Sequence, residues 1–400
     1  MAHGDARGTR PLPAAAEVVV VGGGVMGASV AYHLARDGSD VLLVESGELA
    51  GGSSGKPIGG VRAHFSEAAN VALGLRSLEL FEDFASLPGA DIGLEQHGYL
   101  FALPTGADVA AFEASAAMQR GLGVDSRMLD VAEARRLNPY LSAGYAGAAW
   151  TPRDGWARPR AVVEGYAAGA ERHGARVRTH AAVTAVAHDG DRWQVATTRG
   201  TTTGSALVLC AGAWSRAVGA MVGLDLPVDP VKRQVAFTAP LDPAPPRLPF
   251  TIDFGTTYYL HNADAPGTLL LGASDPDTPV AFDTAYDAGW EPFLHGLAAR
   301  ATPSLADVPL TGGWAGLYET TPDHDALIGE ADAPAGGRVL YACGFSGHGF
   351  LQGPAVGEAV ADLYAGRAGP ARRGVDVSAF TAERFAAAGA GAVRHEANII

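Results

Sequence analysis

The residues with the clearest chemical meaning lie near the start of the chain, in the run 22–27 (GGGVMG). Its glycines have the spacing Gly-x-Gly-x-x-Gly. Gly22 allows a tight turn, Gly24 lets the backbone approach a pyrophosphate, and Gly27 lets a helix pack closely on a strand. Unpaired N–H groups at the start of such a helix favour an anion. The run therefore predicts a phosphate-binding turn.

The flanking residues predict a βαβ unit around this turn. Residues 17–21 (EVVVV) have the β-branched composition of a buried parallel strand, 28–36 read as a helix, and 41–45 (VLLVE) as a second strand. Glu45 ends that strand roughly 20 residues after the first glycine, where a carboxylate accepts hydrogen bonds from ribose hydroxyls. An acid there favours FAD or NAD over NADP. A glycine-rich turn that binds nothing is the alternative, and the strand, helix and acid together argue against it.

Two further glycine-rich segments favour the longer of these dinucleotides. The loop 51–62 (GGSSGKPIGGVR) offers small residues for backbone contact, and its Ser53 and Ser54 can bond a phosphate. The alternative is a flexible surface loop. Residues 344–350 (GFSGHGF) follow a predicted strand at 339–343 and precede a predicted helix at 353–364. N–H groups at that helix start suit the flavin edge where negative charge develops on reduction.

Composition limits the classes of function. The chain has 400 residues, 48% of them hydrophobic, and a formal net charge of −14. Such a chain folds into two or three domains, and its field repels nucleic acid. Its two cysteines provide neither a disulfide framework nor a metal cluster. We expect two buried free thiols in a reducing compartment, with a single disulfide as the alternative, and no metal site.

No apolar run is long enough to span a membrane, and the start of the chain lacks the apolar core of a signal peptide. We expect a cytoplasmic protein with a frayed tail at 1–16 and a loose Ala/Gly-rich tail at 386–400. Further helices are expected at 66–84 and 160–173, and further strands at 98–103, 146–150, 181–187, 193–197, 206–210, 256–260 and 268–272.

Taken together, these segments resemble the D-amino-acid oxidase superfamily of FAD-dependent oxidoreductases, on the branch of glycine oxidase, sarcosine oxidase and the β subunits of related amine dehydrogenases. The resemblance runs from residue 17 to about 366. It rests on 18–27 with Glu45, 51–62, 206–215 (ALVLCAGAWS), 318–323 (YETTPD) and 344–357.

The resemblance implies an α/β fold (α+β overall). A Rossmann-like FAD-binding domain is built from discontinuous segments, and an inserted substrate domain carries an antiparallel or mixed sheet. The expected boundaries are 17–85, 152–225 and 312–385 for the FAD-binding domain, and 86–151 and 226–311 for the substrate domain.

Family roles carry over to matching positions. Val183 resembles the residue whose backbone meets the adenine, and Arg62 resembles the arginine that pairs with the substrate carboxylate. A guanidinium fork matches a carboxylate in two hydrogen bonds; a structural ion pair is the alternative role. The other substrate-side candidates are His348, Tyr259, His261 and Gln352, and His348 also serves loop packing as an alternative. The expected cofactor-binding residues are Gly22, Gly24, Val25, Met26, Gly27, Glu45, Ser46, Ser53, Ser54, Gly59, Gly60, Val183, Ala211, Gly212, Trp214, Gly344, Ser346, Gly347, His348, Gly349, Phe350 and Leu351.

Several positions depart from the family pattern. Gly316 stands where some relatives tether the flavin through cysteine, and Lys56 lies near the place where others use histidine, so we expect non-covalent FAD. Leu351 replaces a second carboxylate-binding lysine, and an oxygen-activating lysine is replaced near Leu270. His261 stands where an arginine is frequent. These changes argue against a simple sarcosine-like substrate and against fast reaction with oxygen.

The implied activity is oxidation of the C–N bond of an amino acid or N-alkyl amino acid. Hydride passes to flavin N5, the imine hydrolyses, and oxygen or a partner accepts the electrons. Oxidation of a 2-hydroxy acid or a specialised metabolite is one alternative. A non-catalytic flavin-binding subunit of a larger complex is another.

Overall fold

A computed structural model describes residues 6–334 and 336–387 of the chain. It contains the predicted βαβ unit in full, and this unit forms part of the first sheet. Its strands are β1 Ala15–Val21, β2 Val41–Val44, β8 Arg176–Arg178, β9 Val183–His188, β10 Trp193–Thr197, β11 Gly200–Leu209, β17 Leu327–Asp332 and β18 Arg338–Cys343. Their order is β17-β18-β11-β1-β2-β8, with β10 attached to β11 and β9 to β10. The four central strands run parallel, so their carboxyl ends meet at one edge.

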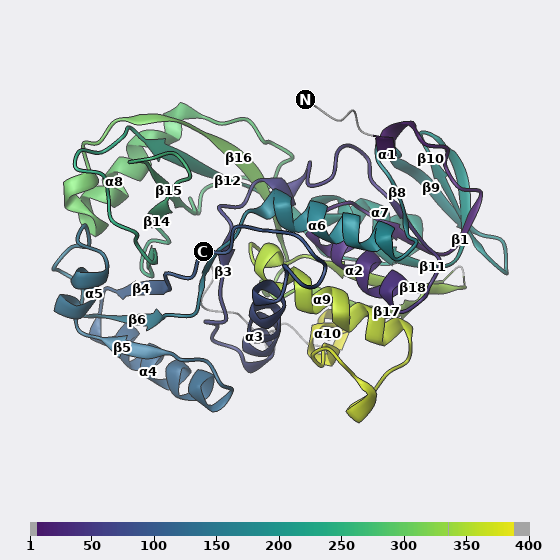
Figure 1. Cartoon of the computed structure of the whole chain (residues 1–400), viewed down its shortest axis with the longest axis horizontal. Helices are drawn as coiled ribbons and strands as arrows, with labels where there is room; N and C mark the ends of the chain where they lie inside the picture. The colour runs from purple at the N-terminus through teal and green to yellow at the C-terminus, as the bar shows by residue number, and fades with distance from the viewer. Residues whose placement is uncertain (1–5, 335, 388–400) are drawn as a thin grey trace.

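Alternate residues of β1 bury against two different layers. Val18 and Val20 face the helices α2 Val25–Arg36, α3 Ala68–Glu82, α6 Pro159–Arg172 and α9 Gly349–Tyr364. Val19 and Val21 face the β9–β10 hairpin and α7 Ser215–Met221 on the other side. Since both faces are covered, the strand is apolar throughout, which explains its sequence. Figure 1 shows this layered half of the molecule at right.

The second sheet lies at left in Figure 1. Its strands are β4 Tyr99–Leu103, β5 Arg127–Leu129, β6 Gly147–Thr151, β12 Asp229–Thr238, β13 Phe250–Asp253, β14 Tyr259–Asn262, β15 Leu269–Ala273 and β16 Leu310–Thr320. Their order is β16-β12-β15-β14-β13-β4-β6-β5, antiparallel except where β13 meets β4. The helix α8 Glu291–Ala301 packs on one face, while α4 Gly106–Gly121 and α5 Val131–Leu137 flank the far end.

Four further short elements are the paired strands β3 Gly60–Val61 and β7 Gly155–Trp156 and the helices α1 Ala6–Thr9 and α10 Arg384–Ala387. Both cysteines are buried free thiols, as expected. Among the described helices, none combines the length and the apolar character that crossing a membrane requires. Within residues 6–334 and 336–387 no His, Cys, Asp or Glu side chains gather in a group of three that could hold a metal.

The N-terminal segment differs from the expected frayed tail at 1–16. Residues 6–9 form α1, β1 begins at Ala15, and Arg7 forms ion pairs with Glu164 at 2.8 Å and Glu171 at 2.9 Å. These ion pairs attach the segment to α6. The expected C-terminal tail falls on residues 388–400, outside the described residues, except that 386 and 387 belong to α10.

Two elements begin elsewhere than the sequence pattern predicts. The helix α9 begins at Gly349 rather than 353, although it contains Pro354, because packing against α2 and α3 holds its first turns. The strand β14 begins at Tyr259 rather than 256, because Thr257 has a φ of 61° and interrupts extended backbone. β16 also pairs with β12 in the second sheet, although the segment from residue 312 was expected in the cofactor domain. The division into two domains stays a prediction.

The end of β1 and the start of α2 approach each other so closely that a side chain has no room. Gly22 has a φ of 112°, and a Cβ on it would lie 2.2 Å from the carbonyl oxygen of Cys210. A Cβ on Gly27 would lie 1.8 Å from the carbonyl oxygen of Gly22. Gly27 is thus required where α2 crosses the end of β1, and Gly22 is required by its positive φ and by the neighbouring end of β11.

We expect Gly27→Ala to lower the free energy of unfolding by at least about 1–3 kcal/mol, the usual cost of overpacking. Chemical denaturation measures it. Gly296→Ala is the matched control, because a Cβ at that position of α8 meets no atom within 4 Å. It should be neutral or stabilising by up to about 1 kcal/mol. Equal unfolding curves for Gly27→Ala and the parent protein would contradict the crossing geometry.

Candidate active site

A cavity of about 770 Å³ lies between the two sheets. One wall is the edge where β1, β2 and β11 end, and the opposite wall comes from β12, β14 and β16. A crevice outside the carboxyl ends of parallel strands is the usual ligand position in such sheets. Its volume lies in the upper range for ligand sites.

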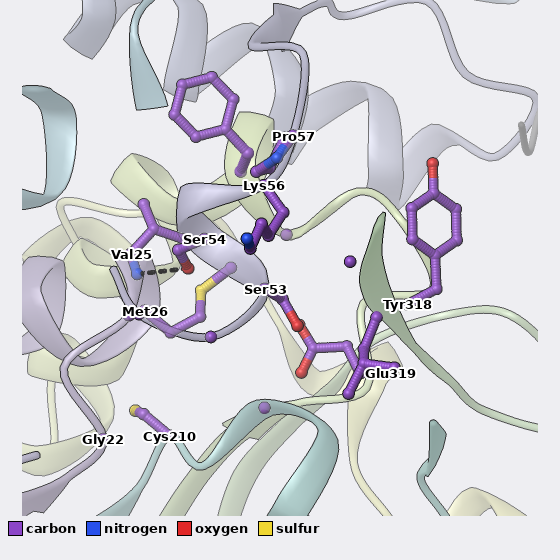
Figure 2. A pocket seen from close by; sticks show the side chains of 18 of the residues that line it. Gly22, Val25, Met26, Ser53, Ser54, Lys56, Pro57, Cys210, Tyr318 and Glu319 are labelled. Atoms are coloured by element: carbon purple, nitrogen blue, oxygen red, sulfur yellow. Dashed lines mark hydrogen bonds between the residues drawn. The ribbon is translucent and has the colours of Figure 1, made fainter. Parts of the chain in front are cut away.

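The N-terminus of α2 opens into this cavity. The Val25 N–H donates to Ser54 Oγ at 2.9 Å, so the 51–62 loop closes over the helix start (Figure 2). The neighbouring Ser53 Oγ is buried without a hydrogen-bond partner in the described part of the chain. The turn therefore brings a helix N-terminus and an unpartnered hydroxyl to the same place.

Glu45 holds its carboxylate at the end of β2. Its Oε2 accepts from the Gly23 N–H at 2.6 Å, and its Oε1 accepts from the Gly47 N–H at 2.8 Å and from Ser46 Oγ at 2.9 Å. These bonds orient the carboxylate along the cavity wall, beside the phosphate-binding turn. This is the geometry that a ribose diol requires of an acceptor.

A second helix N-terminus, that of α9, reaches the cavity at His348 and Gly349. His348 Nε2 lies 3.2 Å from Arg62 Nη2. Burial and the Arg62 charge hold the pKa of His348 well below its usual range, so the ring is neutral at pH 7. Because a guanidinium only donates, Nε2 accepts and the ring proton lies on Nδ1.

Arg62 is a buried cation in the cavity wall, with 1% of its surface exposed. Its Nη1 donates to the His64 carbonyl oxygen, and its guanidinium lies 4.3 Å from the centre of the Phe65 ring. A guanidinium in a low-dielectric cavity attracts an anionic ligand far more strongly than one in water does. The side chain therefore combines charge with a fixed orientation.

Glu319, at the end of β16, brings a carboxyl group to the cavity. Its Oε2 is buried without a hydrogen-bond partner in the described residues, and Figure 2 shows it directed toward Ser53. Burial raises the pKa of Glu319 to about 7, against a hydrogen bond from the Gly344 backbone. The carboxyl group is therefore poised to change charge near neutral pH.

The far end of the cavity is aromatic. Tyr99 and Phe250 stack with ring centres 4.3 Å apart, and Tyr259, Trp314 and Tyr318 complete this wall. The rings give this wall a largely apolar surface, and the tyrosine hydroxyls add a few polar groups that can orient a ligand.

Most of the residues predicted for the cofactor and substrate line this cavity. They are Gly22, Gly24, Val25, Met26, Glu45, Ser46, Ser53, Ser54, Gly60, Arg62, Val183, Ala211, Gly212, Trp214, Tyr259, Gly347, His348, Gly349, Phe350 and Leu351. Four predicted cofactor residues do not line the cavity: Gly27, Gly59, Gly344 and Ser346. Gly59, for example, is in close contact with a neighbouring segment, because a Cβ on it would lie 2.1 Å from the Ala157 carbonyl oxygen.

Two substrate-side candidates lie elsewhere. His261 stacks on Phe250, its Nε2 lies 3.1 Å from the Ile58 carbonyl oxygen, and burial lowers its pKa to about 4. Gln352 lies on α9, and its Nε2 donates to Oδ1 of Asn70 on α3 at 3.1 Å. Neither side chain lines the cavity, because both are used to pack neighbouring elements.

Sequence reasoning missed Arg233 and Glu319 as cavity residues. Glu319 lies within the 318–323 motif, so its acidic character was the available signal. Arg233 and Val235 both line the cavity because alternate residues of β12 share a face, and that period-two signal could have indicated Arg233.

These features fit a dinucleotide with a flavin. Two helix N-termini, a ribose-facing carboxylate and an unpartnered serine hydroxyl converge on one cavity. Gly24 also lines the cavity, and Ser54 packs closely over it, because a Cβ there would lie 2.9 Å from Ser54 Oγ. An adjoining aromatic compartment then suits the ring system.

Replacing Glu319 with Gln should flatten the pH dependence of unfolding. The folded pKa of about 7 is above the ordinary 4.5, so the stability from the protonated form is present below pH 4.5 and is lost as pH rises through 7. Between pH 5 and 8, the free energy of unfolding of the parent protein should fall by up to roughly 3 kcal/mol more than that of Glu319→Gln. Denaturation of the apoprotein at several pH values measures this, and Asp154 titrates alike in both proteins. Parallel curves would refute the assignment.

Comparison with known proteins agrees with this geometry. The family model described as DAO, FAD dependent oxidoreductase, matches residues 17–363. A glycine oxidase from Geobacillus kaustophilus is 31% identical over 87% of this chain and 92% of its own. The 4-methylaminobutanoate oxidase (formaldehyde-forming) of Paenarthrobacter nicotinovorans is 29% identical over 93% of this chain, which spans 46% of that longer protein.

Solved structures show the same fold. The L-proline dehydrogenase from P. horikoshii superposes with a TM-score of 0.86 at 28% identity, covering 94% of this chain and 99% of its own. The expected α/β architecture and the expected dependence on FAD are thus confirmed together. The chain belongs to the DAO family of FAD dependent oxidoreductases.

Proposed function

We propose that this protein oxidises the C–N bond of a small amino acid or N-alkyl amino acid. The observation that carries the proposal is Arg62, a buried guanidinium held by His348 in the wall of a flavin-sized cavity. The names of two relatives describe oxidation of glycine and of 4-methylaminobutanoate, which are both small amines with a carboxylate. A fixed cation suits that shared carboxylate.

Bound FAD would supply the two-electron oxidant, and the chain supplies binding and orientation. Arg62 binds the carboxylate and thereby places the substrate in one orientation. His348 is neutral, with its ring proton on Nδ1, so it accepts a hydrogen bond from Arg62 and adds no second positive charge beside it. The aromatic wall excludes water from the reacting end of the cavity.

The N–H groups at the start of α2 and the carboxylate of Glu45 would hold the pyrophosphate and the ribose. The start of α9 would stabilise negative charge on the reduced ring system. The FAD is held without a covalent bond: Gly316 offers no nucleophile, and His64 lies buried against Phe101 and Phe112 outside the cavity lining. The electron acceptor is oxygen or a partner protein.

The first test is reduction of the flavin without oxygen. Purified holoenzyme is mixed with a panel of amino acids, N-methyl amino acids and 2-hydroxy acids, and the visible flavin band is recorded. We expect bleaching by an amine that carries a carboxylate. Bleaching only by hydroxy acids would reject amine oxidation. Peroxide release on admission of air then separates an oxidase from a dehydrogenase.

Arg62→Met should lower kcat/KM for the amino acid roughly 10- to 100-fold, because the charged hydrogen bonds to the carboxylate are lost. Turnover of the corresponding amine without a carboxylate should change little. Arg62→Lys should recover part of the loss, and the bound flavin content verifies folding. Equal losses for both compounds would show that Arg62 serves structure alone.

A further inference from the structure

The cavity contains a second guanidinium that the proposed reaction does not use. Arg233 lies on β12, opposite Gly316 of β16, and its side chain lines the cavity beside Val235, Tyr259 and Trp314. This wall belongs to the second sheet, whereas Arg62 belongs to the segment that follows the cofactor loop. Lys56 of the cofactor loop also lines the cavity, so the two guanidiniums, which come from separate parts of the fold, are not its only cations.

Arg233 lacks an anionic partner among the described residues. Its Nη1 donates to the Lys232 carbonyl oxygen at 3.0 Å, its guanidinium lies 5.3 Å from the centre of the Tyr318 ring, and its Nε is buried without a hydrogen-bond partner. The adjacent Lys232 points to the other face and forms an ion pair with Asp283 at 2.6 Å. The outward-facing Lys232 is therefore paired with a carboxylate, whereas the cavity-facing Arg233 has no anionic partner among the described residues.

An uncompensated cation in a water-poor cavity costs free energy unless a ligand pairs with it. Tyr318 lies within electrostatic reach of both guanidiniums: burial raises the pKa of its hydroxyl, while Arg233 and Arg62 both oppose that change. The opposite residue, Gly316, has no side chain of its own, and the carbon stem of Lys56 packs over it, because a Cβ on Gly316 would lie 2.6 Å from the Lys56 Cβ. The wall around Arg233 thus offers a ligand in the cavity a charge and a free donor.

We propose that Arg233 binds a second anionic group, so that the preferred substrate is an amino acid with a further carboxylate at its distal end. This inference rests on the proposed function for the position of the first carboxylate. Arg62 would bind the carboxylate next to the oxidised C–N bond, and Arg233 the distal one.

Binding of inert acids to the holoenzyme tests the anion site without turnover. Succinate and butyrate have equal carbon number and differ by one carboxylate. By isothermal titration calorimetry we expect succinate to bind roughly 10- to 100-fold more tightly. Arg233→Met should reduce that ratio to about one, and Arg233→Lys should retain part of it. Arg127→Met, which removes an exposed arginine paired with Asp125 far from the cavity lining, should leave the ratio unchanged.

Equal binding of succinate and butyrate by the parent protein would overturn the inference, even if Arg233→Met failed to fold. A loss of FAD affinity in Arg233→Met with an unchanged ratio would overturn it too, and would assign the guanidinium to the cofactor. Turnover then extends the test: N-methylglutamate should exceed N-methylnorvaline in kcat/KM by a similar factor. If amines reduce the flavin but both acids bind alike, this inference fails and the proposed function stands. If no amine reduces it while succinate binds selectively, the anion site at Arg233 stands, but the proposed function and the assignment of an amino acid as the substrate both fail.

Discussion

The architecture of the cavity depends on the approach of α2 to the end of β1, where only glycine hydrogens separate the two backbones. The same close packing continues from α2 to α9. A Cβ on Gly353 would lie 2.7 Å from a Val25 methyl group, and one on Gly357 would lie 2.1 Å from Ser29 Oγ. Positions 353 and 357 share one face of α9, as 25 and 29 share one face of α2. Two helix N-termini are thereby fixed at one cavity.

This packing explains why segments more than three hundred residues apart form one anion-binding surface. Backbone N–H groups at helix starts need no charged side chain to attract a phosphate or a reduced flavin. In the proposed function, the cavity cations are therefore available to bind the substrate. Glu319 lines the same cavity and has a raised pKa, so a change in its charge near neutral pH would alter that surface.

The cofactor half could be predicted from the sequence because its signals are local. The turn 22–27, Glu45 and the segment 344–350 each belong to one strand–turn–helix unit, and local glycine spacing reports the backbone geometry directly. The length of α9 was underestimated because Pro354 opposes helix locally, while tertiary packing decides in its favour. The frayed tail was mispredicted for a related reason: the ion pairs of Arg7 involve residues in α6, far along the chain.

The substrate half was less predictable because its wall is assembled from strands that are distant in sequence. Whether a strand residue faces the cavity or the solvent depends on register, and a shift of one residue reverses it. Arg233 and Lys232 show this most clearly. They are adjacent in one strand, but Arg233 lines the cavity while Lys232 forms an ion pair with Asp283 on the other face. The second sheet can thus change the charges that it presents without disturbing the glycine contacts of the first. A fold with one cofactor site can in this way present different charges to different ligands, and we expect the residues that select the substrate on β12, β14 and β16 rather than in the glycine turn.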